Sequence, residues 1–321
     1  MSLEPIAMRD ALLERIWQGM SENEETFVVS ADFGSPILDK IRADFPERFV
    51  NVGIAEQNLI NVSAGLALEG YVVFAYAIAP FITMRCYEQI RVSLALLSNV
   101  REMNVNLIGV GAGYSYVVSG PTHQCYEDIT LMRAMPNFQV LSPADHVSAS
   151  AMFDTCANTS GPKYLRLDAQ VLPVIYENLI PDLAKGFYVH EVGRRCCLIA
   201  TGFMLHTALK VASQIQSEGE KLGVVDLFDL ARFSADELEK ILSEYSGIVS
   251  LEEGFEGRGG MDSMLFDFVA RRNIKSKIMN IGVAGSYRFE LGTRAELHEQ
   301  VGIGYKTALE KIRSFVSSLP Y

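Results

Sequence analysis

The chain has 321 residues, of which 49% are hydrophobic, and it carries a formal net charge of −11 at pH 7. A chain of this size can bury a large core, and its length favours two domains. Because Lys and Arg are scattered along the sequence, no basic face is available for the phosphates of DNA or RNA, and we expect no nucleic-acid partner.

The N-terminal sequence MSLEPIAMRD has neither the basic flank nor the apolar core of a signal peptide. No window approaches the roughly 18 uninterrupted apolar residues of a membrane span, so we expect no membrane partner and a cytoplasmic location. The five cysteines are odd in number and show no CxxC spacing, which argues against a disulfide framework and a zinc site. We expect most of them to be buried apolar residues, and we assign no metal ligand.

In chain order, short β-branched runs alternate with segments that have apolar residues at helical spacing. Strands are predicted at residues 26–32, 48–53, 71–77, 105–112, 138–143 and 162–168. Over residues 169–193, two prolines and weak periodicity predict a connection. Strands are predicted again at residues 196–202, 221–227, 246–252 and 277–283, each followed by a helix such as 203–219.

This alternation predicts an α/β fold with two domains, residues 1–175 and 186–321, each with a mostly parallel sheet flanked by helices. Ligands of such sheets bind where a strand leads into a helix. Glu56 opens the helical segment AEQNLINVSAGLALEG after the strand at 48–53. It is either a functional carboxylate or a first-turn glutamate that complements the helix dipole.

A histidine occupies a second junction of this kind. His123 lies in SGPTHQCYED after the strand at 105–112, and Gly120 and Pro121 fix the turn before it. Histidine is suited to proton transfer near neutral pH. The structural alternative is a loop residue whose ring bonds to backbone.

These segments resemble a known family. RFVNVGIAEQNLINVSAGLALEG resembles the cofactor-activating segment of transketolase, and SGPTHQCYED resembles the histidine loop of that enzyme. MRDALLER, FVVSADFGSP and MRCYEQIRVSLAL resemble further parts of its pyrimidine-binding domain. NIGVAGSYRFELGTRAELHEQVGIGYKTALEKI is similar to the C-terminal domains of transketolases and deoxyxylulose phosphate synthases. The resemblance covers nearly the whole chain, in the correct order.

The resemblance implies thiamine diphosphate as cofactor and two catalytic residues. Glu56, among the apolar residues Ile54, Ala55 and Leu59, would hydrogen-bond N1′ of the aminopyrimidine and favour its imino tautomer. His123 would contact the ketose substrate. The further residues implied to border the cofactor are Asp32, Phe33, Phe81, Ile82 and Arg85. Those implied for the substrate are Arg9, Ser119 and Arg166. For Asp32 a strand-end turn, and for Phe33 core packing, are the structural alternatives.

Three departures from the family pattern concern the substrate. The family usually has aromatics at the positions of Ala79 and Ile82, an aspartate at Ser119 and a phosphate-binding arginine at Ala169. Losing a charge-assisted phosphate contact would sacrifice about 1.5–3 kcal/mol of binding, so we expect a substrate other than the usual pentose and hexose phosphates. Arg9, at a position that can reach the phosphate, leaves a phosphorylated sugar open.

One half of a transketolase is missing from this chain. The sequence contains no GDG motif, which in the family belongs to the diphosphate-binding domain and its Mg2+ site. The resemblance therefore implies a separate partner chain that carries this domain and the Mg2+ ligands. Two copies of each chain would form a heterotetramer.

Three classes of function follow. The preferred one is the pyrimidine-binding subunit of a two-chain transketolase-like enzyme, which transfers a two-carbon ketol unit from a ketose to an aldehyde in specialised sugar biosynthesis. The first alternative is a decarboxylating subunit of the same cofactor class, of the deoxyxylulose phosphate synthase or 2-oxoacid dehydrogenase β type. The second is a non-catalytic subunit that kept the fold. LEEGFEGRGG is read as a loop or subunit contact, His146 as structural, and His190, His206 and His298 receive no role.

Overall fold

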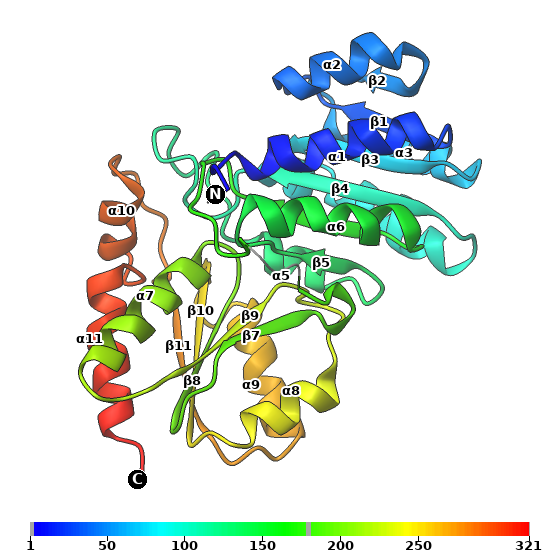
Figure 1. Cartoon of the computed structure of the whole chain (residues 1–321). Coiled ribbons are helices and arrows are strands. Elements are labelled where there is room, and N and C mark those ends of the chain that lie inside the picture. Colours follow the sequence, from blue (N-terminus) through cyan, green and yellow to red (C-terminus); the bar gives the residue numbers. More distant parts are fainter. Residues whose placement is uncertain (1–2, 178–180, 321) are drawn as a thin grey trace. The chain divides into compact units, whose positions relative to one another are not determined.

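The computed structural model describes residues 3–177 and 181–320. The chain divides into two compact units, Met1–Ala112 with Leu131–Ile180 and Gly113–Thr130 with Pro181–Tyr321. Each unit holds one sheet with helices on both of its faces (Figure 1), which confirms the predicted fold class. Residues 178–180 of the predicted connection lie outside the described residues.

The first unit contains a six-stranded sheet in the order β2-β1-β3-β4-β6-β5, and all of its strand pairs are parallel. The strands are β1 (Thr26–Ser30), β2 (Phe49–Asn51), β3 (Val72–Ile78), β4 (Asn104–Val110), β5 (Gln139–Leu141) and β6 (Lys163–Leu167). They follow the predicted runs and are mostly buried, as expected for a parallel sheet covered on both faces. Since β2 and β3 lie on opposite sides of β1, the loops after these strands meet at one edge, where such sheets bind ligands.

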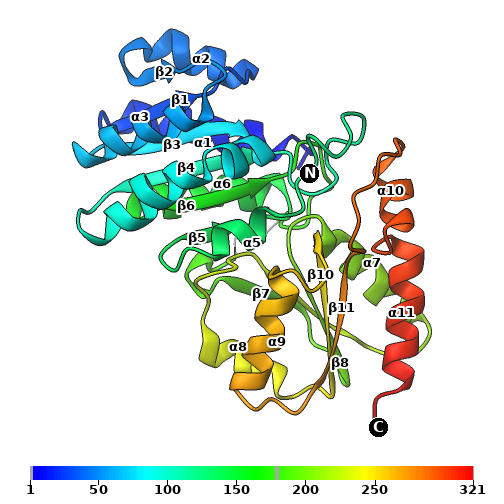
Figure 2. The ribbon, with the colours of Figure 1, turned by 180° about the vertical axis from the view of Figure 1, so that it is seen from behind.

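The helices of this unit cover both faces of its sheet. On one face, α1 (Met8–Glu22) packs against α6 (His146–Asn158). On the other lie α3 (Glu56–Leu68) and the helical segment 81–99, which Figure 2 shows in front of the strands. That segment contains two wide π-type turns, Phe81–Arg85 and Ile90–Leu96, with α4 (Tyr87–Gln89) between them. The remaining helices are α2 (Pro36–Asp44), with Ser35 as its N-cap, and α5 (Asp128–Arg133).

The second unit contains a five-stranded sheet in the order β11-β10-β8-β9-β7. Its strands are β7 (Phe187–Glu191), β8 (Cys196–Ala200), β9 (Gly223–Leu227), β10 (Gly247–Phe255) and β11 (Lys277–Val283). Only β7 runs antiparallel to its neighbour, β9. The prediction of a connection over 169–193 is wrong at β7. This strand is at the sheet edge and mostly half-exposed, so it lacks the continuous apolar run that identified the other strands.

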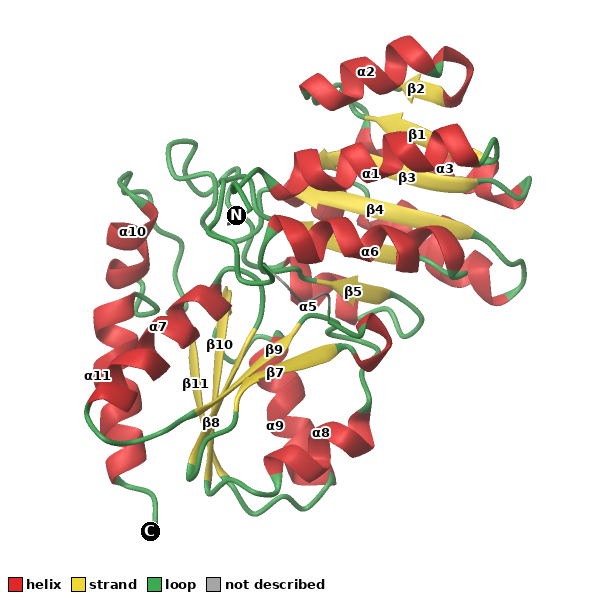
Figure 3. Ribbon diagram, in the orientation of Figure 1, coloured by secondary structure: helices red, strands yellow, loops and turns green. Residues whose placement is uncertain are grey.

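Helices also cover both faces of the second sheet (Figure 3). One group consists of α7 (Met204–Ser217), α10 (Arg294–Gln300) and α11 (Tyr305–Ser317), in which α11 contacts both of the others. The other consists of α8 (Ala235–Leu242) and α9 (Met261–Arg271). Both sheets are thus covered by helices on their two faces.

All five cysteines are buried free thiols, as expected. Burial, with a smaller contribution from the charge of Glu56, raises the pKa of the Cys86 thiol to about 12. Among the described residues, no helix combines the length and hydrophobicity needed to cross a membrane.

Candidate active site

Glu56 is a buried carboxylate at the first position of α3. Gly53, with a φ of +74°, turns the chain after β2, and Ala55 is the N-cap without a side-chain hydrogen bond. Glu56 is only 5% exposed, and its Oε1 accepts a hydrogen bond from Nη1 of Arg85 at 2.8 Å. The carboxylate thus turns toward a cation from another segment, whereas a glutamate that served only the helix dipole would need neither burial nor this partner.

Arg85 is contributed by the first π-type turn of segment 81–99. Its guanidinium carbon lies 3.8 Å from the centroid of the Phe81 ring, a cation–π geometry. Gln57 donates to its backbone oxygen at 3.2 Å. The Arg85 side chain is 47% exposed, so it can rotate away from Glu56 into solvent. Wide turns of this kind are frequent at functional sites.

A pocket of about 390 Å3 lies beside this ion pair. It is lined by Ile54, Ala55, Glu56, Gln57, Asn58 and Arg85. The apolar setting expected around Glu56 is only partly present, because Ile54 is 75% exposed and Arg85 approaches the carboxylate. The sequence did not reveal this pairing, since the two residues are 29 positions apart.

The residues after β1 form a tight turn and an aromatic stack. Asp32 has a left-handed φ of +52°, and it exchanges hydrogen bonds with Asn51, whose amide donates to Asp32 Oδ1 at 3.0 Å and accepts from the Asp32 N–H at 3.2 Å. Phe33 stacks on Tyr76 at 5.3 Å between ring centroids. Arg9, in the first turn of α1, bonds to Asp10 at 2.9 Å and interacts with Tyr76. Arg9, Phe33 and Tyr76 therefore form one group.

Two further residues singled out in the first unit are buried within it. Ile82 is fully buried in the first π-type turn. Arg166 is 2% exposed and lies in β6, where it pairs in register with Gly109 of β4.

The histidine loop, residues 113–125, belongs to the second unit. Gly113 and Cys125 close it through two backbone hydrogen bonds of 2.8 and 3.0 Å. At its tip, the His123 N–H donates to the Gly120 carbonyl at 3.1 Å, and His123 Nδ1 lies 3.0 Å from Thr122 Oγ1. Ser119 is exposed, and its backbone oxygen accepts from Thr122 Oγ1 at 3.4 Å. The imidazole is half-buried, and this contact leaves Nε2 as the ring nitrogen that does not face Thr122.

A buried ionic cluster in the second unit was missed by the sequence analysis. Glu253, near the end of β10, is paired with Arg294 and His298 of α10. The only signal in the sequence is the pair of consecutive glutamates in the apolar strand GIVSLEEGF. Two neighbouring carboxylates in a buried strand require partners, but these partners lie 41 and 45 residues away.

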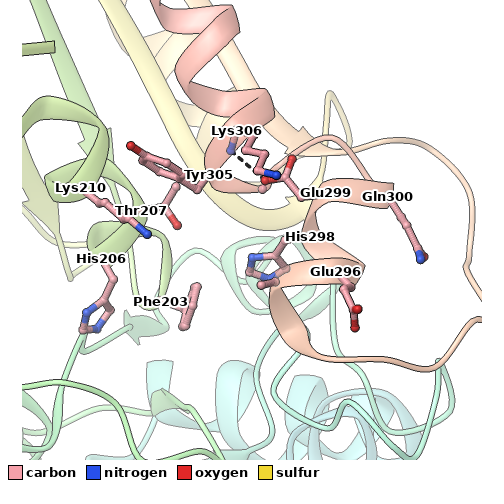
Figure 4. A pocket seen from close by; sticks show the side chains of 12 residues that line it. Phe203, His206, Thr207, Lys210, Glu296, His298, Glu299, Gln300, Tyr305 and Lys306 are labelled. Atoms are coloured by element: carbon pink, nitrogen blue, oxygen red, sulfur yellow. Dashed lines mark hydrogen bonds between the residues drawn. The ribbon is translucent and has the colours of Figure 1, made fainter. Parts of the chain in front are cut away.

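A cavity of about 630 Å3 lies among α7, α10 and α11. Figure 4 shows Phe203 and His298 close together in its wall, with Lys210, Tyr305 and Lys306 further along. Both glutamates in the wall are used by helix ends, because Glu296 accepts from Thr293 and Glu299 accepts from the first backbone N–H groups of α11. Across residues 3–177 and 181–320, no group of three or more His, Cys, Asp or Glu side chains is arranged to hold a metal ion.

Two units with mostly parallel sheets, the first with a buried carboxylate at a strand-to-helix junction and the second with a histidine loop, define a class of two-domain α/β proteins. The chain belongs to the transketolase family: the family model "Transketolase, pyrimidine binding domain" matches residues 4–174, and "Transketolase, C-terminal domain" matches residues 184–306.

Relatives and solved structures agree with this assignment. The chain is 28% identical to an apulose-4-phosphate transketolase subunit of Actinobacillus succinogenes, covering 92% of this chain and 94% of the relative. It is 26% identical to the 6-deoxy-6-sulfo-D-fructose transketolase subunit SqwH of Clostridium sp. strain MSTE9, covering 97% and 94%. A split-gene transketolase, solved as an inactive β4 tetramer, superposes with a TM-score of 0.84 at 28% identity over 99% of this chain and all of that one.

Enzymes of this family depend on thiamine diphosphate. The residues beside Glu56 fit such a group. The carboxylate lines a pocket, and its partner among the described residues is a half-exposed arginine that can rotate away. A pyrimidine ring presents the polar edge that a buried carboxylate requires.

Proposed function

We propose that this chain is the pyrimidine-binding subunit of a two-chain transketolase-like enzyme that transfers a two-carbon ketol unit from a ketose to an aldehyde. The observation that carries the proposal is the burial of Glu56 at the wall of a pocket, paired with an arginine that is half exposed. A carboxylate kept out of water is costly unless it is paired, and here the partner is half exposed, so a ligand at this strand-to-helix junction can take its place.

Glu56 is the residue that would hold the cofactor's pyrimidine. Its Oε1 would share a proton with the ring once Nη1 of Arg85 has withdrawn, and the Phe81 ring would keep the guanidinium nearby. Phe33 and Ile82 are proposed to border the same group, with Asp32 shaping the turn after β1. When bound, thiamine diphosphate supplies the carbanion chemistry, and the protein orients it.

His123 is proposed to contact the donor sugar. Its half-buried ring presents Nδ1 to Thr122 Oγ1, and Nε2 is the nitrogen that would bond a substrate oxygen as this oxygen gains charge during the reaction. Ser119 lies in the exposed part of the same loop, where it can meet a sugar hydroxyl. Arg9 and Arg166 complete the proposed substrate set.

The substrate is proposed to be a specialised ketose. Two relatives are named for apulose 4-phosphate and for 6-deoxy-6-sulfo-D-fructose, which supports a sugar outside the common pentose and hexose phosphates. The absence of an arginine at Ala169 and of an aspartate at Ser119 supports the same view.

The partner is proposed to be a separate chain that binds the diphosphate and Mg2+, in a heterotetramer with two copies of this chain. The lack of a GDG motif and the nearly full-length match to one subunit of a transketolase support this arrangement. The reducing cytoplasm is the proposed location, and five buried free thiols are compatible with it.

The proposal is tested by assaying the complex of this chain with its partner in the presence of thiamine diphosphate and Mg2+. We expect ketol transfer from a ketose donor to an added aldehyde, measured by mass spectrometry of the lengthened product. Release of CO2 from a 2-oxoacid without transfer from any ketose would instead identify a decarboxylating subunit.

A further inference from the structure

Glu253 contacts the base of the histidine loop directly. Its carboxylate is fully enclosed near the end of β10, with 2% of the residue exposed. Oε1 accepts a hydrogen bond from the backbone N–H of Tyr114 at 3.2 Å. Tyr114 is the first residue inside the two hydrogen bonds that join Gly113 to Cys125. The carboxylate therefore holds the loop at its first residues.

Two cationic or donor side chains from α10 fix this carboxylate. Arg294 makes a forked contact, with Nη2 2.7 Å from Oε2 and Nε 3.1 Å from Oε1. His298 Nε2 lies 2.7 Å from Oε1. Burial by itself would raise the pKa of Glu253, but Arg294 and His298 outweigh it and hold that pKa well below its usual value. The charged carboxylate is an acceptor only, which suits the Tyr114 N–H.

The loop base is shaped to receive Glu253. Gly113 has a left-handed φ of +55°, and a Cβ atom there would overlap the Glu253 carboxylate. The Tyr114 ring packs on Tyr126 at 4.8 Å and against the edge of His298 at 5.5 Å between centroids. Glycine is therefore needed for both the turn and the close approach.

Hydrogen bonds continue from this base to His123. Tyr126 donates its hydroxyl to Gln124, and Gln124 Nε2 donates to the Tyr116 carbonyl across the loop at 3.4 Å. The Gln124 N–H, next to His123, donates to the Gly120 carbonyl at 3.2 Å. The residues on both sides of His123 are thus tied to the rest of the loop by hydrogen bonds, and the Gly120 carbonyl also accepts from the His123 N–H at 3.1 Å.

We propose that Glu253 is a positioning residue: by holding the Tyr114 backbone it fixes the histidine loop so that His123 is presented to the donor sugar. This role rests on the proposed function, because it takes His123 as a substrate contact. Stability alone does not account for the cluster, since buried ion pairs are often no more stabilising than apolar residues of similar volume. Such an ion pair can instead fix the position of the backbone that it contacts.

The neighbouring glutamate supplies a matched control. Glu252 is also buried, and it accepts from the backbone N–H groups of Met261 at 3.0 Å and Asp262 at 2.7 Å. It therefore caps α9, which is a different element from the histidine loop. Glu252→Gln and Glu253→Gln make the same change in adjacent buried side chains, so a general loss of stability should appear in both.

The first experiment is backbone hydrogen exchange, followed by mass spectrometry, on the purified chain. In Glu253→Gln we expect peptides covering residues 113–126 to exchange at least tenfold faster than in the wild type. In Glu252→Gln we expect that segment to be unchanged and the start of α9 to exchange faster. Equal protection of residues 113–126 in both variants would overturn the proposal.

The second experiment uses the complex with the partner chain. We expect kcat/KM for the donor ketose to fall at least tenfold in Glu253→Gln, while the Kd of thiamine diphosphate stays within twofold, because Glu56 belongs to the other unit. If kcat/KM and the affinity for thiamine diphosphate fall by the same factor, or if neither changes, a positioning role is contradicted. If Glu253→Gln does not fold, Arg294→Lys replaces the fork by a single contact and should show the same pattern more weakly.

The two experiments separate this proposal from the one on which it rests. Faster exchange of the loop in Glu253→Gln, with no ketol transfer by the wild-type complex, would support the role of Glu253 in holding the loop and reject the proposed function.

Discussion

At the scale of single residues, the pair of Glu56 and Arg85 is the central feature of the proposed cofactor pocket. The carboxylate is buried and the guanidinium is half exposed. When Arg85 moves into solvent, water can hydrate it, but the buried Glu56 is left without its partner. Any group that binds to Glu56 therefore has to replace the hydrogen bond that Arg85 donates. Arg85 would thus remain paired with the carboxylate until a ligand replaces it.

Replacing Glu56 by Gln should reduce turnover by about 10²–10⁴-fold, the usual size of a proton-transfer contribution. Folding should be nearly intact, because the change alters one atom at the start of α3 and frees an arginine that water can hydrate. Turnover and thermal unfolding of the complex measure the two effects. The exposed Glu69 at the end of α3 gives the control, Glu69→Gln, and wild-type turnover in Glu56→Gln would remove the role.

Replacing His123 by Ala should lower kcat/KM for the donor ketose by about 10–10³-fold through loss of one hydrogen bond to a developing charge. The half-buried ring contributes little to the core, so the melting temperature should change little. Steady-state kinetics with varied donor checks this, with Val118→Ala as control because Val118 is 76% exposed in the same loop. Unchanged kinetics would take His123 out of the site.

At the scale of elements, the runs that could be predicted from the sequence are those with continuous apolar strands. The segment VVFAYAI became β3 because its length and β-branched residues suit a strand buried on both faces. FYVHE was missed because β7 is a half-exposed edge strand that follows a proline-containing stretch. The positions of Glu56 and His123 between a strand and a helix could be predicted, because such a junction is a local pattern; their roles stay predictions.

Contacts between elements could not be predicted in the same way. Arg85, at the end of a π-type turn in segment 81–99, reaches Glu56 from 29 residues further along the chain. The cluster of Glu253, Arg294 and His298 joins a strand to a helix 41 or more residues later. Neither contact produces a regular spacing of residues that could be recognised in the sequence. Both follow from packing, which a single sequence does not record.

The cluster that joins β10 to α10 should make stability depend on pH. The folded-state pKa of Glu253 is lowered, so its contribution is present above the unfolded value of about 4.3 and is lost as the pH falls below it. Arg294 and His298 face this carboxylate, and below pH 5 the histidines of the unfolded chain are already protonated. The urea midpoint of the wild type should fall between about pH 5 and pH 3.

In Glu253→Gln this fall should be shallower by up to about 1.4 kcal/mol per pH unit, the contribution of a single proton. Glu252→Gln again provides the comparison for a buried neighbour. Parallel pH profiles for Glu253→Gln and the wild type would show that the folded-state pKa of Glu253 is not lowered.

At the scale of the whole molecule, each of the two units with mostly parallel sheets carries one of the two proposed catalytic residues outside its strands, and the sequence contains no GDG motif. On the proposed function, the chain would supply one half of a cofactor site. The Mg2+ ligands would then be supplied by the partner chain.

The five thiols should report on the integrity of both units together. All five are buried, and burial raises the pKa of Cys156 and of Cys196 to about 12. The thiolate is the reactive form, so Ellman's reagent should react slowly with the native chain. In denaturant it should react with all five thiols. Rapid reaction of a thiol in the native chain would show that one unit opens readily.

The central claim is that this chain is one subunit of a thiamine diphosphate enzyme, and an affinity pull-down from its native cell extract tests it most directly. With thiamine diphosphate and Mg2+ present, we expect a second chain carrying a GDG-type motif to copurify in about equal amount, as identified by mass spectrometry. If no such chain appears and the purified protein binds no thiamine diphosphate, the claim is contradicted, and Glu56 becomes a carboxylate that serves only the start of α3.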